Sequence, residues 1–95
     1  MESKEDRQYS VGVHVSPDQA REWLSSSKGN RNLKQSTIDM LVREILADRW
    51  KPGASVIRFD EDGCLIDGHH RLTAIMKSGK TVLVDVARGV SSADS

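Results

Sequence analysis

The residues with the clearest chemical potential stand together at positions 67–71, with the sequence Asp-Gly-His-His-Arg. A short apolar run precedes them, and a helix is expected to begin within them, at His70. A helix N-terminus has free backbone N–H groups and a partial positive charge, so it favours an anion. Arg71 offers a planar set of donors that fits phosphate oxygens, and Gly68 lets a ligand approach the backbone. The segment therefore predicts a phosphate-binding corner.

The same five residues also allow a purely structural interpretation. A structural helix start normally carries acidic residues, and only Asp67 fits that role. In this alternative Asp67 caps the helix and one histidine is a satisfied core residue. Arg71, and His69 and His70 when charged, oppose the helix dipole, so an anion explains the group better. His69 and His70 could donate hydrogen bonds to this anion or act as catalytic proton carriers.

Other kinds of site are weaker interpretations. Cys64 with His14, His69 and His70 could form a zinc site, but Cys64 and His69 lack a standard ligand spacing, and adjacent histidines rarely reach one metal. The acidic residues 60–62 resemble a calcium-loop fragment without the rest of its pattern, and a hairpin turn explains them better. We therefore expect no metal site formed by the protein alone.

A polar connection at residues 28–33 supplies second-tier site candidates. Asn30 and Arg31 stand in it and could flank the phosphate corner. A solvated connection explains them equally well. Both interpretations stay open for Asn30 and Arg31.

The elements that must position this corner follow from the hydrophobic pattern. Alternation predicts a first strand over 11–15, and Ser16 and Pro17 then start a helix that ends near Ser27. A second helix is expected to be capped by Ser36, because apolar residues recur after it at intervals of three and four. The side chains predicted to face the core from these elements are Val11, Val13, Val15, Ala20, Trp23, Leu24, Ile38, Leu41, Val42, Ile45 and Leu46.

The second half of the chain predicts a hairpin, a helix and a last strand. Apolar runs at 55–59 and 64–66 flank an Asp-Gly loop, which is typical of a β-hairpin. A third helix is expected over 70–78, with Gly79 as its C-cap. A strand is expected over 81–87, with Val82, Val84 and Val86 on one face. The order β-α-α-β-β-α-β predicts a single small α+β domain with a small mixed sheet. We expect it to span residues 10–90, with flexible tails at 1–9 and 91–95.

Composition limits the classes of function. The chain has 95 residues, of which 37% are hydrophobic, so one domain with a modest core is expected. Its 14 basic and 14 acidic residues give zero net charge, which makes DNA a less favoured partner, since DNA-coating proteins carry a positive excess. One cysteine excludes an internal disulfide and favours a reduced, cytoplasmic location. No apolar run approaches a membrane span.

Residues 65–74 resemble the "DGQHR" signature of ParB-like proteins, many from phages and prophages, which share a superfamily with sulfiredoxin. The resemblance covers roughly residues 11–90 and implies a ParB/sulfiredoxin-like fold in which this corner binds nucleotide phosphates. Gly68 and Arg71 match the nucleotide-binding corner of both branches, and His70 matches a sulfiredoxin histidine. The other matching segments, in order, are Ser16-Pro17, Asn30-Arg31, Asp48-Arg49-Trp50, Ile57-Arg58-Phe59-Asp60 and Val86-Ala87-Arg88-Gly89-Val90.

The chain departs from the family at His69. Sulfiredoxins carry their catalytic cysteine at this position, so sulfinic-acid reduction is not implied. Partition-type ParB proteins carry an acidic residue there, and the signature itself has glutamine. A chain of 95 residues also leaves no room for the helix-turn-helix and dimerisation domains of those proteins, so chromosome segregation is not implied.

Three functions stay open on the sequence alone. The favoured one is a nucleotide- or phosphate-binding domain, acting as a phage-encoded regulator or inhibitor that sequesters a nucleotide. The second is a ParB-like nuclease or nucleotide hydrolase, with His69 or His70 as acid or base and Mg²⁺ held by Asp67 and phosphate. The third is a protein-interaction module, including a homodimer through Trp23 or Trp50. The enzyme ranks lower because no second carboxylate cluster is present.

Overall fold

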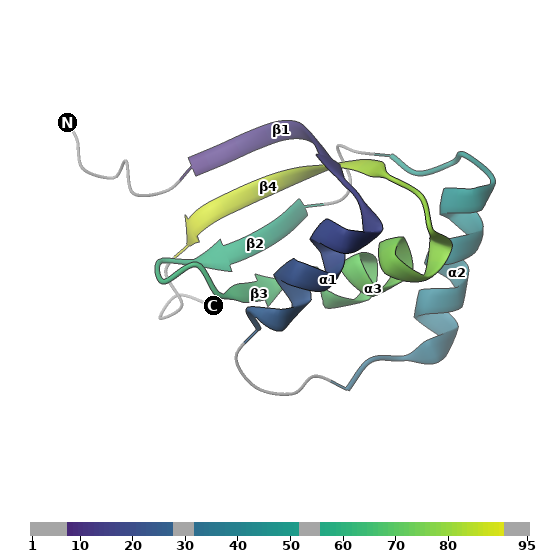
Figure 1. Ribbon diagram of the computed structural model, residues 1–95, viewed down its shortest axis with the longest axis horizontal. Coiled ribbons are helices and arrows are strands. Elements are labelled where there is room, and N and C mark those ends of the chain that lie inside the picture. The colour runs from purple at the N-terminus through teal and green to yellow at the C-terminus, as the bar shows by residue number, and fades with distance from the viewer. Residues whose placement is uncertain (1–7, 28–31, 52–55, 91–95) are drawn as a thin grey trace.

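The computed structural model describes residues 8–27, 32–51 and 56–90. Their elements follow the predicted order β-α-α-β-β-α-β, and they form an α+β domain with three helices and a four-stranded mixed sheet (Figure 1). No helix in these ranges is long and apolar enough to cross a membrane. The elements are β1 (Gln8–Val15), α1 (Pro17–Ser25), α2 (Gln35–Leu46), β2 (Val56–Asp60), β3 (Leu65–Asp67), α3 (His69–Ser78) and β4 (Val82–Val90).

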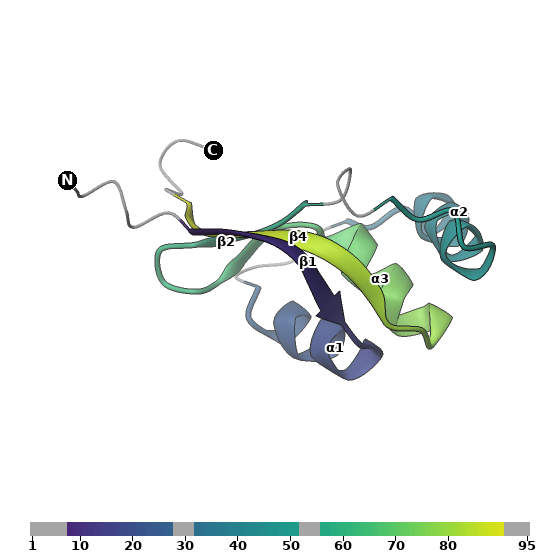
Figure 2. The same ribbon diagram turned by 90° about the horizontal axis from the view of Figure 1, so that it is seen from above.

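The sheet has the strand order β1-β4-β2-β3. Strand β4 pairs antiparallel with β1 and parallel with β2, while β2 and β3 form the predicted antiparallel hairpin. Helices α1 and α3 lie on one side of the sheet, and α2 lies beside α3 (Figure 2). Helix α3 therefore contacts both other helices.

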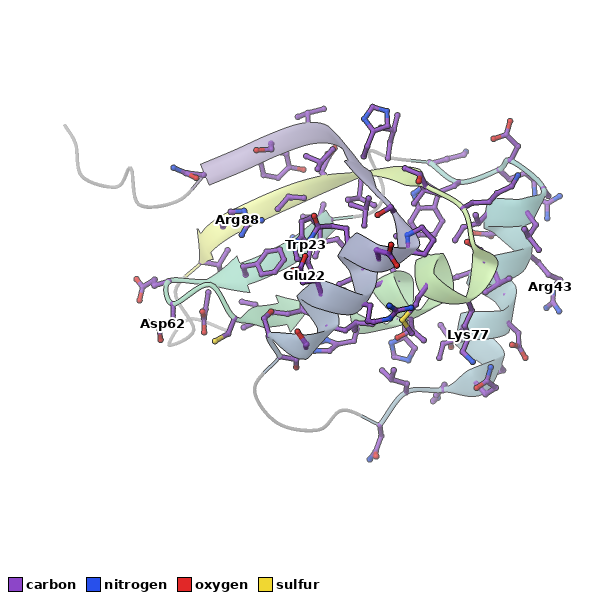
Figure 3. All side chains as sticks on the ribbon, in the orientation of Figure 1. Glu22, Trp23, Arg43, Asp62, Lys77 and Arg88 are labelled. Carbon is purple, nitrogen blue, oxygen red and sulfur yellow. The ribbon has the colours of Figure 1, made fainter. Side chains whose placement is uncertain are left out.

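The core fills the space between the sheet and the helices. Trp23 meets Phe59 edge-on, with ring centroids 5.0 Å apart, and Arg88 lies over both rings (Figure 3). The indole N–H of Trp50 donates to the Leu83 carbonyl at 2.9 Å. Both tryptophans therefore pack against the core, whose buried members are Val15, Ala20, Ile38, Ile45, Ile57, Phe59, Leu65, Leu72, Ala74, Ile75, Val84 and Val86.

A bulge in β1 overturns one core prediction. The strand begins at Gln8, and its register with β4 shifts across Val11 and Gly12. The Gly12 N–H donates to the Asp85 carboxylate, which also accepts the Tyr9 hydroxyl. An extra residue reverses the alternation of side chains on one side of a bulge. Val11 is consequently 77% exposed, and its prediction as a core residue was wrong.

The start of α2 is the second correction. Its N-cap is Lys34, not the predicted Ser36, and no side chain caps it. The backbone N–H of Lys34 donates to His70 Nε2 at 3.0 Å, so a contact with α3 fixes where this helix begins.

Leu46, the last residue of α2, is 53% exposed, so its prediction as a core residue was also wrong.

The other predicted boundaries differ by small amounts. Residues 8 and 9 were predicted to belong to a flexible tail, which was wrong, because both pair with β4 as part of β1. Helix α3 begins at His69 and ends at the predicted C-cap Gly79, while β4 continues to Val90. Val84 and Val86 belong to the buried core and Val82 packs against it, as expected of three valines on one face. Residue 55, predicted to begin the hairpin, lies outside the described residues.

Candidate functional site

The corner between β3 and α3 depends on Gly68. This residue is the N-cap of α3, and its φ of +105° is one that L side chains rarely adopt. A Cβ built on Gly68 would lie 2.5 Å from Cδ1 of Ile57. The missing side chain therefore makes room for β2. Gly68 also lines the cavity described below, and the approach of a ligand to its backbone stays a prediction.

No acidic residue in the first turn of α3 compensates the positive end of its helix dipole. Its first turn has no acidic residue, and its N-cap glycine has no side chain to accept a hydrogen bond. Asp67 does not cap the helix, because its carboxylate accepts a hydrogen bond from Arg58 at 2.9 Å. The part of the structural alternative in which Asp67 is the cap was therefore wrong. Its other part, one histidine as a satisfied core residue, agrees with His69, which is buried and hydrogen-bonded to Ser27.

Helix α1 shows what a structural helix start looks like in the same protein. Ser16 accepts a hydrogen bond from the Gln19 N–H at 3.1 Å, as predicted, and Asp18 lies in the first turn. Both features compensate the orphan N–H groups and the positive end of the dipole. Helix α3 has neither, so its N-terminus remains electrostatically suited to an anion.

A cavity of about 280 Å³ opens at this N-terminus. All five residues of the predicted corner line it, so the structure brings the main site candidates together. Asn32 and Leu33, which precede α2, line it as well. The lining residues are Asn32, Leu33, Asp67, Gly68, His69, His70 and Arg71.

The His69 ring is held by a hydrogen bond with Ser27, which follows α1. Its Nε2 atom and the Ser27 hydroxyl are 2.8 Å apart, and only 8% of the residue is exposed. The backbone carbonyl of His69 accepts the Thr73 hydroxyl at 2.8 Å. His69 is thus a fixed ring at the wall of the cavity.

The hydrogen bond of His70 determines which of its ring nitrogens carries a proton. Because the Lys34 N–H is a donor, His70 Nε2 must accept, at 3.0 Å. The ring in this state is neutral, with its proton on Nδ1. His70 lines the cavity, and in this state its Nδ1–H group is a neutral hydrogen-bond donor.

Arg71 is the cation of the site. It is half-buried at the third position of α3 and lines the cavity. Within the described residues, no acidic side chain forms an ion pair with its guanidinium. The charge of Arg71 is consequently available to an anion in the cavity.

Some site residues were missed from the sequence, and two candidates are not placed. Asn30 and Arg31 lie outside the described residues. Asn32 and Leu33 belong to the polar connection that the sequence flagged, whereas no local signal connects Ser27 with a histidine 42 positions away.

The zinc and calcium alternatives can be compared with the described part of the chain. Across residues 8–27, 32–51 and 56–90, no group of three or more His, Cys, Asp or Glu side chains is placed to hold a metal ion. Cys64 is a half-buried free thiol, and the Asp60 carboxylate accepts the N–H groups of Asp62 and Cys64 within the hairpin turn.

Comparisons of the chain with protein-family models, with curated proteins and with solved structures gave no match.

Proposed function

We propose that this protein binds a nucleotide or another phosphate ligand in the cavity at the N-terminus of α3. One observation carries the proposal: Arg71, without an acidic partner among the described residues, lines a cavity at a helix start that has no acidic residue in its first turn. A guanidinium and a positive dipole end placed together repel each other unless an anion lies between them. A phosphate satisfies both.

The charges around the cavity support a phosphate over a neutral ligand. Asp67 is the only acidic residue among the described lining residues, and Arg58 compensates it through the 2.9 Å ion pair. His70 is a neutral donor in its bonded state. The remaining full charge is that of Arg71, in addition to the partial positive charge of the helix N-terminus.

The resemblance of residues 65–74 to the DGQHR signature supports the same ligand class. We extend the proposal on this ground to a ParB/sulfiredoxin-like fold and to a cytoplasmic regulator or inhibitor, of phage type, that senses or sequesters a nucleotide. The α+β order and the mixed sheet are compatible with this extension.

A nuclease or nucleotide hydrolase is the second candidate. The observation that favours it is the fixed His69 ring at the cavity wall, since a positioned imidazole can accept a proton from a reacting group. Mg²⁺ would enter with a nucleoside triphosphate, and Asp67 is the carboxylate that could ligate it. Release of product from excess nucleotide or DNA would distinguish this candidate from binding alone.

The test is a thermal-shift screen of the wild type, Arg71→Ala and a matched control. The panel holds inorganic phosphate, nucleoside mono- and triphosphates and a short DNA, each with and without magnesium. A ligand at about 100 times its Kd should add roughly 2.7 kcal/mol of stability. Lys77→Ala is the control, because Lys77 is an exposed cation in the last turn of the same helix (Figure 3).

Arg71→Ala should weaken binding by about 10- to 150-fold, since a hydrogen bond to a charged group contributes about 1.5–3 kcal/mol. Lys77→Ala should bind as the wild type does. Equal affinity of the wild type and Arg71→Ala for every ligand that binds would overturn the proposal. No shift with any ligand in the panel would overturn it as well.

A further inference from the structure

Three consecutive serines end helix α1, and their hydroxyls have different partners. Ser25 donates to the carbonyl of Glu22 at 2.6 Å. Ser26 donates to the carbonyl of Trp23 at 2.7 Å and accepts the Leu65 N–H at 3.2 Å. These two hydroxyls satisfy backbone groups, which is the usual role of serine at a helix end.

Ser27 differs because its hydroxyl lies against a ring nitrogen. The Ser27 Oγ and His69 Nε2 atoms are 2.8 Å apart. A serine hydroxyl within hydrogen-bond distance of a histidine is the arrangement that activates a nucleophile, because the imidazole can take the hydroxyl proton. The ring is also fixed, since His69 is buried at the first position of α3.

The position of this pair relates it to the cavity. His69 lines the cavity, so the Ser27 hydroxyl is one hydrogen bond away from its wall. Gly68 and Arg71 line the same cavity. A phosphate held at the N-terminus of α3 would therefore share the cavity with His69, whose ring is the hydrogen-bond partner of Ser27.

We propose that Ser27 accepts a phosphoryl group from a nucleoside triphosphate bound in this cavity. The inference rests on the proposed phosphate site and extends it from binding to a covalent step. The Ser27 hydroxyl transfers its proton to His69 Nε2 as its oxygen forms a bond to the γ-phosphorus. The bond from that phosphorus to the β–γ bridging oxygen breaks, and its electron pair leaves with the nucleoside diphosphate. The products are phosphoserine at position 27 and a nucleoside diphosphate.

The test measures the intact mass of the purified protein after incubation with ATP, GTP, CTP or UTP and magnesium. The wild type should gain the mass of one phosphoryl group with at least one of these nucleotides, and fragmentation should place it on Ser27. Ser27→Ala should gain none, whereas Ser25→Ala, the matched control, should be labelled as the wild type is. Ser27→Thr keeps a hydroxyl and should be labelled. His69→Asn should slow labelling by roughly 100- to 10,000-fold, the usual contribution of a general base.

Thermal shifts recorded on the same samples separate this inference from the proposed function. If the wild type binds a nucleotide but gains no mass, the phosphoryl transfer is overturned while the binding site stands. Labelling that persists in Ser27→Ala, or an adduct with the mass of a nucleotidyl group, also overturns it. A wild type that binds none of the nucleotides and gains no mass overturns both.

Discussion

Replacing Gly68 with alanine tests how the candidate site is built. Gly68 has a φ of +105°, and an added Cβ would lie 2.5 Å from Cδ1 and 3.4 Å from Cα of Ile57. Backbone strain at such a φ costs about 1–3 kcal/mol, and an extra methyl group in a packed core costs about 1–3 kcal/mol more. We therefore expect Gly68→Ala to lower the free energy of unfolding by about 2–6 kcal/mol.

Gly79 offers a control with a positive φ and no contact. Its φ is +73°, and no atom lies within 4 Å of an added Cβ. Gly79→Ala should therefore cost only backbone strain, about 1–2 kcal/mol. A second control is Ile57→Val, which deletes the Cδ1 atom that the new methyl group would meet. Combined with Gly68→Ala, it should recover part of the loss, although alone it costs about 0.5–1.5 kcal/mol.

Urea unfolding followed by tryptophan fluorescence measures all four proteins and the double variant, since Trp23 and Trp50 both pack against the core. The coupling between the Gly68 and Ile57 substitutions should exceed the roughly 0.5 kcal/mol expected of independent sites. If Gly68→Ala costs no more than Gly79→Ala, or if the two substitutions simply add, the steric account of this corner is refuted.

Three other expectations concern capping, titration and ligand charge. Ser16→Ala should lower the free energy of unfolding by about 1 kcal/mol because it removes a helix cap. Ser36→Ala, within the first turn of α2, should change it by less than about 0.5 kcal/mol. Urea denaturation of both variants measures the two changes, and an equal loss in both would contradict the assignment of Ser16 as the cap. The hydrogen bond to Asp85 raises the pKa of Tyr9, the only tyrosine, so its absorbance titration should have a midpoint above 10.0 that falls in Asp85→Asn. The contribution of this bond to stability should be complete below the unfolded pKa and lost as the pH rises through the folded one; an unchanged midpoint in Asp85→Asn would contradict it. Asp67→Asn removes negative charge from the cavity lining and should tighten the binding of inorganic phosphate without metal, as measured by calorimetry, whereas weaker binding would show that the carboxylate assists the ligand.

The parts of the fold that the sequence predicted depend on near neighbours. Ser16 and Pro17 specify a helix start by themselves, and the Asp-Gly turn specifies a hairpin. The alternation of Val82, Val84 and Val86 likewise identifies the inner face of β4 without reference to any other element. Each of these signals lies within a few residues of the structure that it determines.

The errors arose where a distant residue decides the local structure. Asp85 holds the bulge that turns Val11 outward, and it is 73 positions away from Gly12. His70 sets the start of α2 through Lys34, 36 positions away. No pattern within a single element contains these contacts, so alternation and capping preferences gave the wrong residue in each case.

The candidate site shows the same division. Its five central residues could be found because they are contiguous, and the structure places all of them on one cavity. The packing reason for a glycine at position 68 was missed, since the neighbour that an added Cβ would meet is Ile57 in another strand. The contact of Ser27 with His69 was missed for the same reason.

The position of β4 between β1 and β2 has a consequence for biosynthesis. Of the four strands, β4 leaves the ribosome last, yet it is the only strand that joins β1 to the β2–β3 hairpin. Until it emerges, the earlier strands cannot form a continuous sheet, and their apolar faces lack the strand that completes the layer. Pairing between distant segments is slow and leaves strand edges exposed to other chains. Before β4 is available, β1 and the β2–β3 hairpin therefore have strand edges without their native partner, and such edges can pair with other chains.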